Sequence, residues 1–138
     1  RPTTPLREPQ IMEDAVKLFF QNKSEASSLR SGHIAPESPY KWFLKDSNNY
    51  FKGLMDNLTP ERVNLPRQSF PSVYVPDGYI DILKSSVILN SGTLHGDKML
   101  VFESPLCVEI DTEDDFKYLE YQVKKTGSII LDHYNNNK

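Results

Sequence analysis

The sequence predicts an α/β sandwich. Two segments, residues 8–22 and 112–127, carry apolar residues at the three-to-four-residue spacing of amphipathic helices. Between them, residues 73–82 and 98–103 are rich in the β-branched, aromatic and large apolar residues typical of strands. Strands that alternate with helices favour a sheet covered by helices.

The first predicted helix covers residues 8–22. Pro9 is tolerated there because the first turn of a helix does not need its N–H group. A short, polar and weakly alternating strand is expected next, over residues 24–33, and a loop over 35–38. The apolar face of the helix consists of Ile11, Ala15, Leu18 and Phe19.

A β-hairpin is predicted in the middle of the chain. Residues 40–45 and 50–54 read as its two strands, and Asp46-Ser47-Asn48-Asn49 as the turn, because Asn and Asp accept left-handed conformations. Residues 56–72 contain three prolines, which favours an extended excursion over a helix.

The second half of the chain returns to strands and helices. The β-run over residues 73–82 is expected to be broken at Pro76-Asp77-Gly78, and a short helix to follow around residues 83–89. Residues 98–103 and 106–110 are predicted as two further strands.

The last predicted helix has the clearest end signals. Thr112 is the expected N-cap and Asp115 stands where a capping-box partner belongs. Two lysines complement the C-terminal end of the helix, and Gly127 ends it. Residues 128–138 are predicted to form a tail. The apolar stripe of the helix consists of Phe116, Leu119 and Val123.

Composition limits the class of protein. With 138 residues, 38% hydrophobic and 25% charged, the chain reads as one globular domain over 1–138, with 39–72 as the excursion. A net charge of −3 argues against a nucleic-acid coat. The sequence shows no membrane-span pattern and no signal-peptide pattern. A single cysteine, Cys107, fits a reducing cytoplasm.

The most informative pattern is Glu109-Ile110-Asp111-Thr112. On a strand, Glu109 and Asp111 would point to the same side, at the strand-to-helix junction where open α/β sheets bind ligands. Two carboxylates together with substrate phosphates suit Mg²⁺. The alternative is an acidic first helical turn over 111–115, favoured by the helix dipole, although that reading does not require Glu109.

Four separated motifs resemble those of one enzyme family, the acylneuraminate cytidylyltransferases and the related enzymes for legionaminic acid, pseudaminic acid and Kdo. Each motif alone is weak, but all four occur in the family's order and together span most of the chain. They are Arg1-Pro2-Thr3-Thr4-Pro5-Leu6-Arg7, Ser38-Pro39-Tyr40-Lys41, Pro66-Arg67-Gln68 with Val75-Pro76-Asp77-Gly78-Tyr79-Ile80, and Glu109-Ile110-Asp111-Thr112 with Asp115.

The resemblance implies a Rossmann-like, three-layer cytidylyltransferase sandwich. It also implies a Mg²⁺-dependent reaction in which the anomeric hydroxyl of a nine-carbon acidic sugar attacks the α-phosphorus of CTP and pyrophosphate leaves. A homodimer in the cytoplasm is expected, with no membrane or nucleic-acid partner.

The resemblance also implies residue roles. Glu109 and Asp111 would hold the metal, and Arg67 and Lys41 would meet the sugar carboxylate or the phosphates as catalytic cations. The alternative for both cations is an ordinary surface position. The residues expected at the sugar are Arg1, Asp77, Gly78, Tyr79 and Asp81.

Three positions depart from the family. Asp77 stands where Asn is usual, Val75 where sialic-acid enzymes often have Arg, and Asp81 where an aromatic residue is common. On an extended chain Asp77, Tyr79 and Asp81 share a face, so the sugar site would be unusually acidic. We therefore expect a nonulosonate other than N-acetylneuraminate as the substrate.

A further departure concerns the nucleotide. The family's phosphate-cradling segment, Ala-Arg-x-Gly-Ser-Lys, does not occur in these 138 residues. We expect such a segment upstream of Arg1 and expect the chain to be inactive without it. Alternative hypotheses are a non-catalytic sugar-binding or dimerising fragment, a Kdo-type enzyme and, last, an acidic interaction domain.

The aromatic residues and the histidines allow more than one functional interpretation. The aromatics of the predicted hairpin, Trp42, Phe43, Tyr50 and Phe51, could form a stacking platform, but dimer contact is favoured. The histidines, His33, His95 and His133, show no zinc-type spacing and are read as solvated or internally hydrogen-bonded, although His95 could touch substrate.

Overall fold

The computed structural model describes residues 3–137 as two compact units. One unit contains the described residues up to His33 together with those from Pro76 onward, and the other is Ile34–Val75. We refer to them as the sheet unit and the arm unit. The predicted excursion over 39–72 lies within the arm unit.

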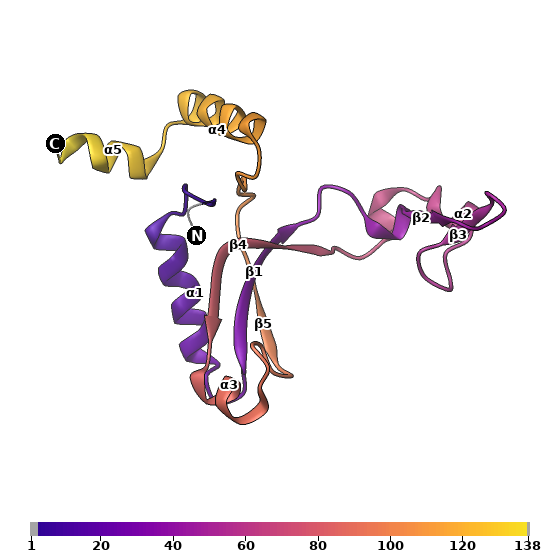
Figure 1. Cartoon of the computed structure of the whole chain (residues 1–138), viewed down its shortest axis with the longest axis horizontal. Helices are drawn as coiled ribbons and strands as arrows, with labels where there is room; N and C mark the ends of the chain where they lie inside the picture. Colours follow the sequence, from indigo (N-terminus) through magenta and orange to yellow (C-terminus); the bar gives the residue numbers. More distant parts are fainter. Residues whose placement is uncertain (1–2, 138) are drawn as a thin grey trace. The chain divides into compact units, whose positions relative to one another are not determined.

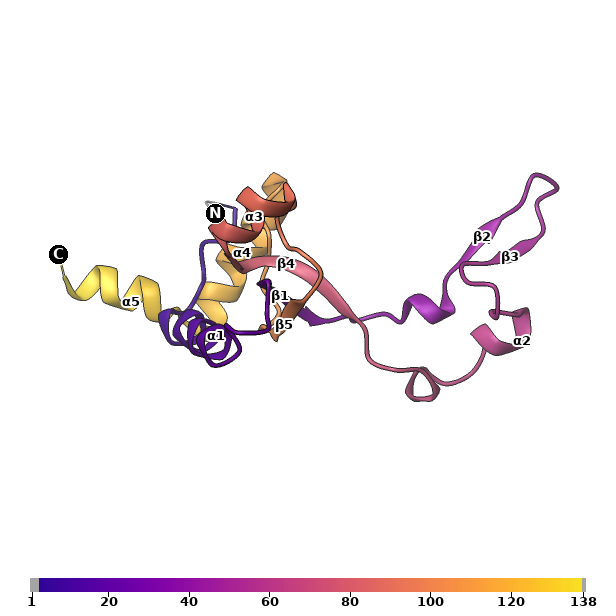
Figure 2. The ribbon, with the colours of Figure 1, turned by 90° about the horizontal axis from the view of Figure 1, so that it is seen from below.

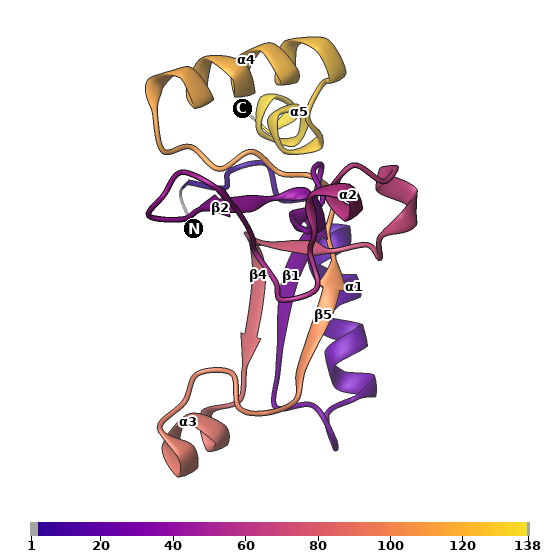
Figure 3. The same cartoon turned by 90° about the vertical axis from the view of Figure 1, so that its right-hand side faces the viewer.

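The sheet unit is built on a three-stranded sheet in the order β4-β1-β5 (Figure 1). Strand β1 (Ser28–Ile34) pairs in parallel with β5 (Met99–Glu103), from Ser28 opposite Met99 to Gly32 opposite Glu103. Strand β4 (Tyr74–Leu83) runs in the opposite direction on the other side of β1 (Figure 3). The sheet is therefore mixed, and the predicted α/β class is confirmed.

Helix α1 (Pro9–Gln21) lies along one face of this sheet (Figures 1 and 3). Its buried face joins Ala15 and Phe19 to Leu29 of β1, with Ile80, Ile82, Leu100 and Phe102 packed against them. The helix forms where its apolar spacing predicted, because burying that face removes apolar surface from water.

The opposite face of the sheet is more open. Side chains alternate along β5, so Met99 and Val101 point away from the α1 core, and they are 42% and 52% exposed. In Figures 1 and 3 no helix of the described chain lies along this face. The third layer of the expected sandwich therefore stays a prediction.

Three further helices belong to the sheet unit. Helix α3 (Ser85–Ser91) ends at Gly92, and α4 (Glu113–Thr126) has the predicted capping box between Thr112 and Asp115. The predicted tail contains α5 (Ile129–Asn136), where Ser128 accepts a hydrogen bond from Leu131 N. A capped N-terminus thus continues helical structure beyond Gly127, where the sequence reading placed only a tail.

Two strand predictions in the sheet unit are wrong. Residues 106–110 form no strand, because the segment after β5 has no neighbouring strand to supply a hydrogen-bond ladder. Its Ile110 N instead donates to Thr3 O at 2.8 Å. Conversely, Pro76-Asp77-Gly78 does not break β4, which is continuous over ten residues.

The arm unit carries the predicted hairpin, β2 (Phe43–Lys45) and β3 (Phe51–Gly53), paired antiparallel (Figure 2). Asp46 closes its turn by accepting from Asn48 N and Tyr50 N, and Asn49 adopts a φ of 69°. Strand β2 is shorter than predicted because Pro39–Lys41 forms a 3₁₀ turn.

The proline-rich part of the arm unit is not purely extended. Helix α2 (Pro60–Val63) makes one turn, capped by Thr59 with Pro60 in its first position, and Arg67–Ser69 forms a 3₁₀ turn. Proline at the first helical position starts a helix instead of preventing one, which the sequence reading overlooked. Across residues 3–137, no helix is both long and apolar enough to cross a bilayer.

Candidate functional site

Parts of three of the four sequence motifs come together in the sheet unit, whereas the Pro66-Arg67-Gln68 part of the third motif belongs to the arm unit. Thr3 O accepts from Ile110 N, which places the first motif beside the acidic segment. Arg7 donates to Thr4 O at 3.1 Å and to Tyr79 O at 3.4 Å. The Tyr79 hydroxyl, on a residue only 2% exposed, accepts from Glu8 N at 2.7 Å. Arg1, predicted to contact the sugar, lies outside the described residues.

Asp77 is the centre of a buried polar network at the same end of the sheet. Its Oδ1 accepts from Ser31 Oγ at 2.5 Å and from Tyr79 N at 3.0 Å. Its Oδ2 accepts from Ser104 Oγ at 2.5 Å and lies 3.2 Å from His33 Nδ1. The network therefore joins β1, β4 and the segment after β5.

The Asp77 carboxylate is ionised despite its burial, with a side chain only 5% exposed. Burial on its own would raise the pKa of Asp77. The hydrogen bonds from Ser104, Ser31, Tyr79 N and His33 outweigh that effect and hold this pKa below its usual value. All four bonds favour the charged form, so the network is satisfied by an anion.

The second acidic residue of the expected sugar site also has an internal partner. Arg30 Nε donates to Asp81 Oδ1 at 2.8 Å and its Nη2 to Oδ2 at 3.3 Å, a bidentate pair that raises the pKa of Arg30 mainly through the hydrogen bond. Hydrogen bonds within the protein satisfy the carboxylates of Asp77 and Asp81 in the absence of a substrate. The charge of these two carboxylates is therefore no reason to exclude N-acetylneuraminate as a substrate.

The remaining two residues expected at the sugar, Gly78 and Tyr79, are buried in β4. Contact of any of these four residues with a sugar stays a prediction. In the structure Asp77 and Asp81 hold β4 to β1, and Tyr79 holds it to the N-terminal segment.

The acidic pair, Glu109 and Asp111, is exposed and lies on the segment between β5 and α4. With no strand over 106–110, strand alternation no longer explains their orientation. Asp111 is instead positioned by the cap of α4, because its backbone N donates to Asp115 Oδ2 at 3.2 Å. The same Asp115 oxygen accepts from Thr112 Oγ1 and N, and these bonds lower the pKa of Asp115.

The donor set fits Mg²⁺ as one part of a larger coordination shell. Glu109 and Asp111 supply the hard carboxylate oxygens that this ion prefers, whereas Asp115 is committed to the cap. Residues 3–137 contain no group of three or more His, Cys, Asp or Glu side chains arranged to hold a metal. Phosphate oxygens and water would have to complete the shell.

The two predicted catalytic cations lie in the arm unit, where both bind backbone carbonyls. Lys41 Nζ donates to Leu65 O at 2.8 Å. Arg67 donates from Nη1 to Pro36 O at 2.7 Å and from Nη2 to Ala35 O at 2.8 Å. Arg67 also lines a cavity of about 340 Å³ with Ser38, whose buried hydroxyl has no partner among residues 3–137.

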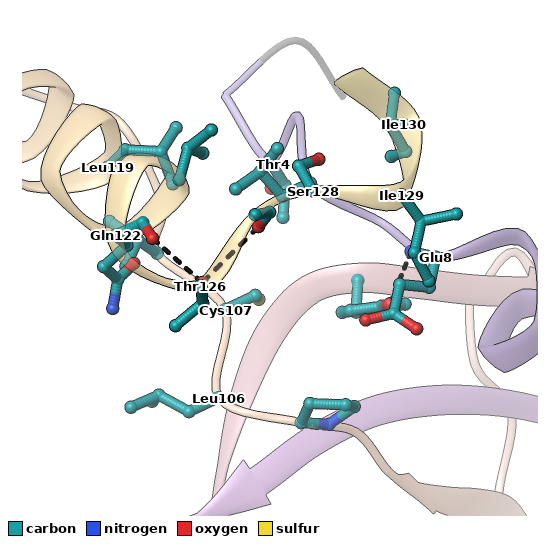
Figure 4. Close-up of a pocket in the computed structure, with 16 residues that line it drawn as sticks. Thr4, Glu8, Leu106, Cys107, Leu119, Gln122, Thr126, Ser128, Ile129 and Ile130 are labelled. Carbon is teal, nitrogen blue, oxygen red and sulfur yellow. Dashed lines mark hydrogen bonds between the residues drawn. The ribbon is translucent and has the colours of Figure 1, made fainter. Parts of the chain in front are cut away.

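A second cavity, of about 250 Å³, lies in the sheet unit (Figure 4). Its walls come from the N-terminal segment, the residues after β5, the C-terminal half of α4 and the start of α5. Burial, together with the charges of Asp77 and Glu109, raises the pKa of the Cys107 thiol in this wall to about 11.

Sequence reasoning did not single out Ser31 and Ser104, and it treated His33 as solvated or satisfied. The structure shows that His33 is hydrogen-bonded, as is His95, whose Nδ1 lies 3.3 Å from Ser28 Oγ. No local pattern joins Ser31, His33 and Ser104 to Asp77, because 27 to 46 residues separate them from it. The strand pairing alone brings them together.

Comparison with known proteins adds no assignment. The sequence matches no protein-family model, and no curated protein matches it.

Proposed function

We propose that this chain forms the sugar- and metal-binding part of a cytidylyltransferase that transfers CMP from CTP to the anomeric hydroxyl of a nonulosonic acid. The fold proposed for the whole catalytic domain is the Rossmann-like three-layer sandwich. The observation that supports the proposal most is the meeting of parts of three motifs at one end of the sheet: Thr3–Arg7, the Asp77-Gly78-Tyr79 stretch of β4 and Glu109–Thr112.

The position of this assembly suits ligand binding. Strands β1 and β5 are parallel, and Ser104 N extends their ladder by donating to Gly32 O at 3.1 Å. Their carboxyl ends therefore meet where His33 and Ser104 follow, and the acidic segment begins five residues later. Open α/β sheets bind ligands at this edge.

Each chain residue has a limited task in this proposal. Mg²⁺, held by Glu109 and Asp111, would neutralise phosphate charge when bound. The capping box keeps Asp111 at a defined position before α4. The positive charges of Lys41 and Arg67 suit a sugar carboxylate or a phosphate, although their present hydrogen bonds go to carbonyl groups of the arm unit.

The arm unit supports a homodimer as the working form. Its hairpin region exposes large apolar side chains, among them Trp42 at 50%, Phe43 at 61% and Tyr50 at 73%. Exposed aromatic side chains grouped on one short hairpin are typical of an association surface. We propose a second copy of the chain as the partner and a cytoplasmic location for the enzyme.

A non-catalytic, dimerising fragment is the second candidate. The sequence feature that favours it is the lack of an Ala-Arg-x-Gly-Ser-Lys segment within the 138 residues. Pyrophosphate release separates the two candidates, because only the enzyme produces it.

The deciding experiment measures pyrophosphate release by the full encoded protein with Mg²⁺, CTP and a panel of nonulosonic acids and Kdo. Glu109→Gln and Asp111→Asn are expected to lower the rate by at least about 100-fold, because each removes a charged metal ligand. Glu113→Gln is the matched control, since it removes an exposed carboxylate from the first turn of α4. Circular dichroism checks that each variant is folded.

Two results would count against the proposal. Wild-type protein that releases no pyrophosphate with any sugar would favour the non-catalytic fragment. Normal rates in both Glu109→Gln and Asp111→Asn would remove the metal assignment even if the protein is active.

A further inference from the structure

His33 and Asp77 form a carboxylate–imidazole pair whose geometry fixes the state of the imidazole. Asp77 Oδ2 lies 3.2 Å from His33 Nδ1, and the carboxylate is held in its ionised form by its other donors. An ionised carboxylate only accepts hydrogen bonds, so Nδ1 carries the proton. In the neutral ring, Nε2 then presents a lone pair.

The second ring nitrogen is uncommitted in the part of the chain that the structure describes. No hydrogen bond or ion pair of Nε2 is found within residues 3–137, whereas Nδ1 has the Asp77 contact. The His33 side chain is 14% exposed, compared with 5% for Asp77. The imidazole therefore lies at the accessible side of a network whose carboxylate is enclosed.

The position of His33 in the fold suits a role in proton transfer. His33 is near the carboxyl end of β1, directly after Gly32, which pairs with Glu103 of β5. The acidic segment begins five residues after Ser104, whose hydroxyl donates to Asp77, so the pair and this segment belong to the same edge of the sheet. The titratable or charged groups around this edge are Arg7, Tyr79, Cys107 and Glu109.

A purely structural role explains less of this arrangement. Asp77 already accepts three hydrogen bonds, from Ser31, Ser104 and Tyr79 N, and any donor could supply a fourth. An imidazole differs from other donors in having a second, basic nitrogen that its partner carboxylate orients. Histidine held in this way is a common proton acceptor in enzymes.

We propose that His33 is the general base of the reaction proposed above and that Asp77 is its positioning residue. His33 Nε2 takes the proton from the anomeric hydroxyl as that oxygen forms a bond to the α-phosphorus of CTP. The bond from the α-phosphorus to the oxygen that bridges it to the β-phosphorus breaks, and pyrophosphate leaves with the electron pair. The proton returns to solvent from the imidazolium. This inference rests on the proposed function.

The test compares His33→Asn with His133→Asn in the full encoded protein. The asparagine amide at position 33 can still donate to Asp77, so the network and the fold are retained while the base is lost. His133 lies on α5 and is the matched control for loss of a histidine. Folding is checked by thermal unfolding, and rates are measured from pH 5 to 9 with Mg²⁺, CTP and the best nonulosonic acid.

We expect His33→Asn to lower kcat by about 100-fold or more with little change in KM, since general-base catalysis contributes on that scale. The wild-type rate should fall towards acidic pH, because a general base acts only in its unprotonated form, and the variant should lose that fall. Histidine-selective ¹⁵N NMR should show the wild-type proton on Nδ1. The control should keep the wild-type rate and profile.

The possible failures are distinct. A folded His33→Asn protein with the wild-type rate and pH profile would overturn the base assignment while leaving the proposed function intact, and so would a proton found on Nε2. Wild-type protein without pyrophosphate release would overturn the proposed function and, with it, the role of His33.

Discussion

The sheet unit and the arm unit are stabilised in different ways. The sheet unit has a core in which Ala15 and Leu29 are fully buried and Phe19 is 6% exposed. In the arm unit the buried hydrophobic residues are Ala35 and Leu58, while Phe43 and Tyr50 are mainly exposed. The sheet unit thus has a buried apolar core, whereas the arm unit buries few apolar side chains.

Polar contacts hold the arm unit together where a core is lacking. Arg67 joins its segment to the carbonyls of Ala35 and Pro36, Lys41 binds Leu65 O, and Ala35 N donates to Val73 O at 2.8 Å. Such bonds contribute little net free energy each, about 1 kcal/mol. The sheet unit is therefore stabilised mainly by its apolar core, and the arm unit depends more on polar contacts.

The largest expected effect comes from truncating one phenylalanine in each unit. Phe19→Ala should lower the free energy of unfolding by about 3–5 kcal/mol, because it empties a buried site, whereas Phe43→Ala should change it by less than about 1 kcal/mol in the monomer. Chemical denaturation at low protein concentration measures both. Equal losses would contradict the difference between the units.

The next effect concerns the polar network of the sheet unit. Asp77→Ala should cost about 2–4 kcal/mol, because it leaves the donors of Ser31, Ser104 and Tyr79 N unpaired, whereas Asp81→Ala should cost about 1 kcal/mol or less. The folded pKa of Asp77 is below its ordinary value of 3.8. The wild-type protein should therefore have its full extra free energy of unfolding above the ordinary pKa of 3.8 and should lose it as the pH falls through the lowered pKa.

Denaturation of both Asp77→Ala and Asp81→Ala across pH 2 to 7 tests this ordering. If Asp81→Ala were the more destabilising variant, the Arg30 ion pair rather than the buried network would hold β4 to β1.

A smaller effect is expected from a glycine of the arm unit. A Cβ added at Gly53 would lie 2.3 Å from Leu58 O, so Gly53→Ala must displace the backbone beside a buried leucine, at a cost of about 1–3 kcal/mol. Gly92→Ala is the control in the sheet unit, since nothing lies within 4 Å and only its φ of 70° opposes alanine, at about 1 kcal/mol. NMR of each variant should show shifts confined to its own unit.

The smallest effect on stability involves Cys107. Because burial raises its pKa from 9.0 to about 11, the folded state favours the neutral thiol. This contribution is fully present below the unfolded pKa and is lost as pH rises towards the folded pKa. At pH 8 the thiol should react with a disulfide reagent about 100-fold more slowly than in unfolded protein. Equal rates in folded and unfolded protein would show that the thiol is not buried.

Local sequence signals predicted the elements that depend on near neighbours. The helix over 8–22, the hairpin turn at Asp46 and the capping box between Thr112 and Asp115 are all set by residues within four positions of one another. The predicted strand over 106–110 failed for the opposite reason, since a strand exists only if another strand lies beside it.

The residues of the candidate site also differ in how far away in sequence their partners lie. The acidic pair, Glu109 and Asp111, could be picked out from its pattern and its place before a helix. The hydrogen-bond partners of Asp77 could not be predicted, because Ser31, His33 and Ser104 lie on β1 and after β5, far away in sequence. The sequence placed Asp77 at a sugar site, whereas its contacts show a buried anion that joins three segments.

Hydrophobic spacing and turn chemistry act over one or two turns of chain, so the amino-acid sequence was enough to predict α1, α3, α4 with its Thr112 cap, the hairpin and the acidic segment. Only the tertiary structure decided which carboxylates are enclosed and which are exposed, and that His33 lies against Asp77. Burial and long-range hydrogen bonding depend on strand order, and strand order depends on the packing of the whole unit.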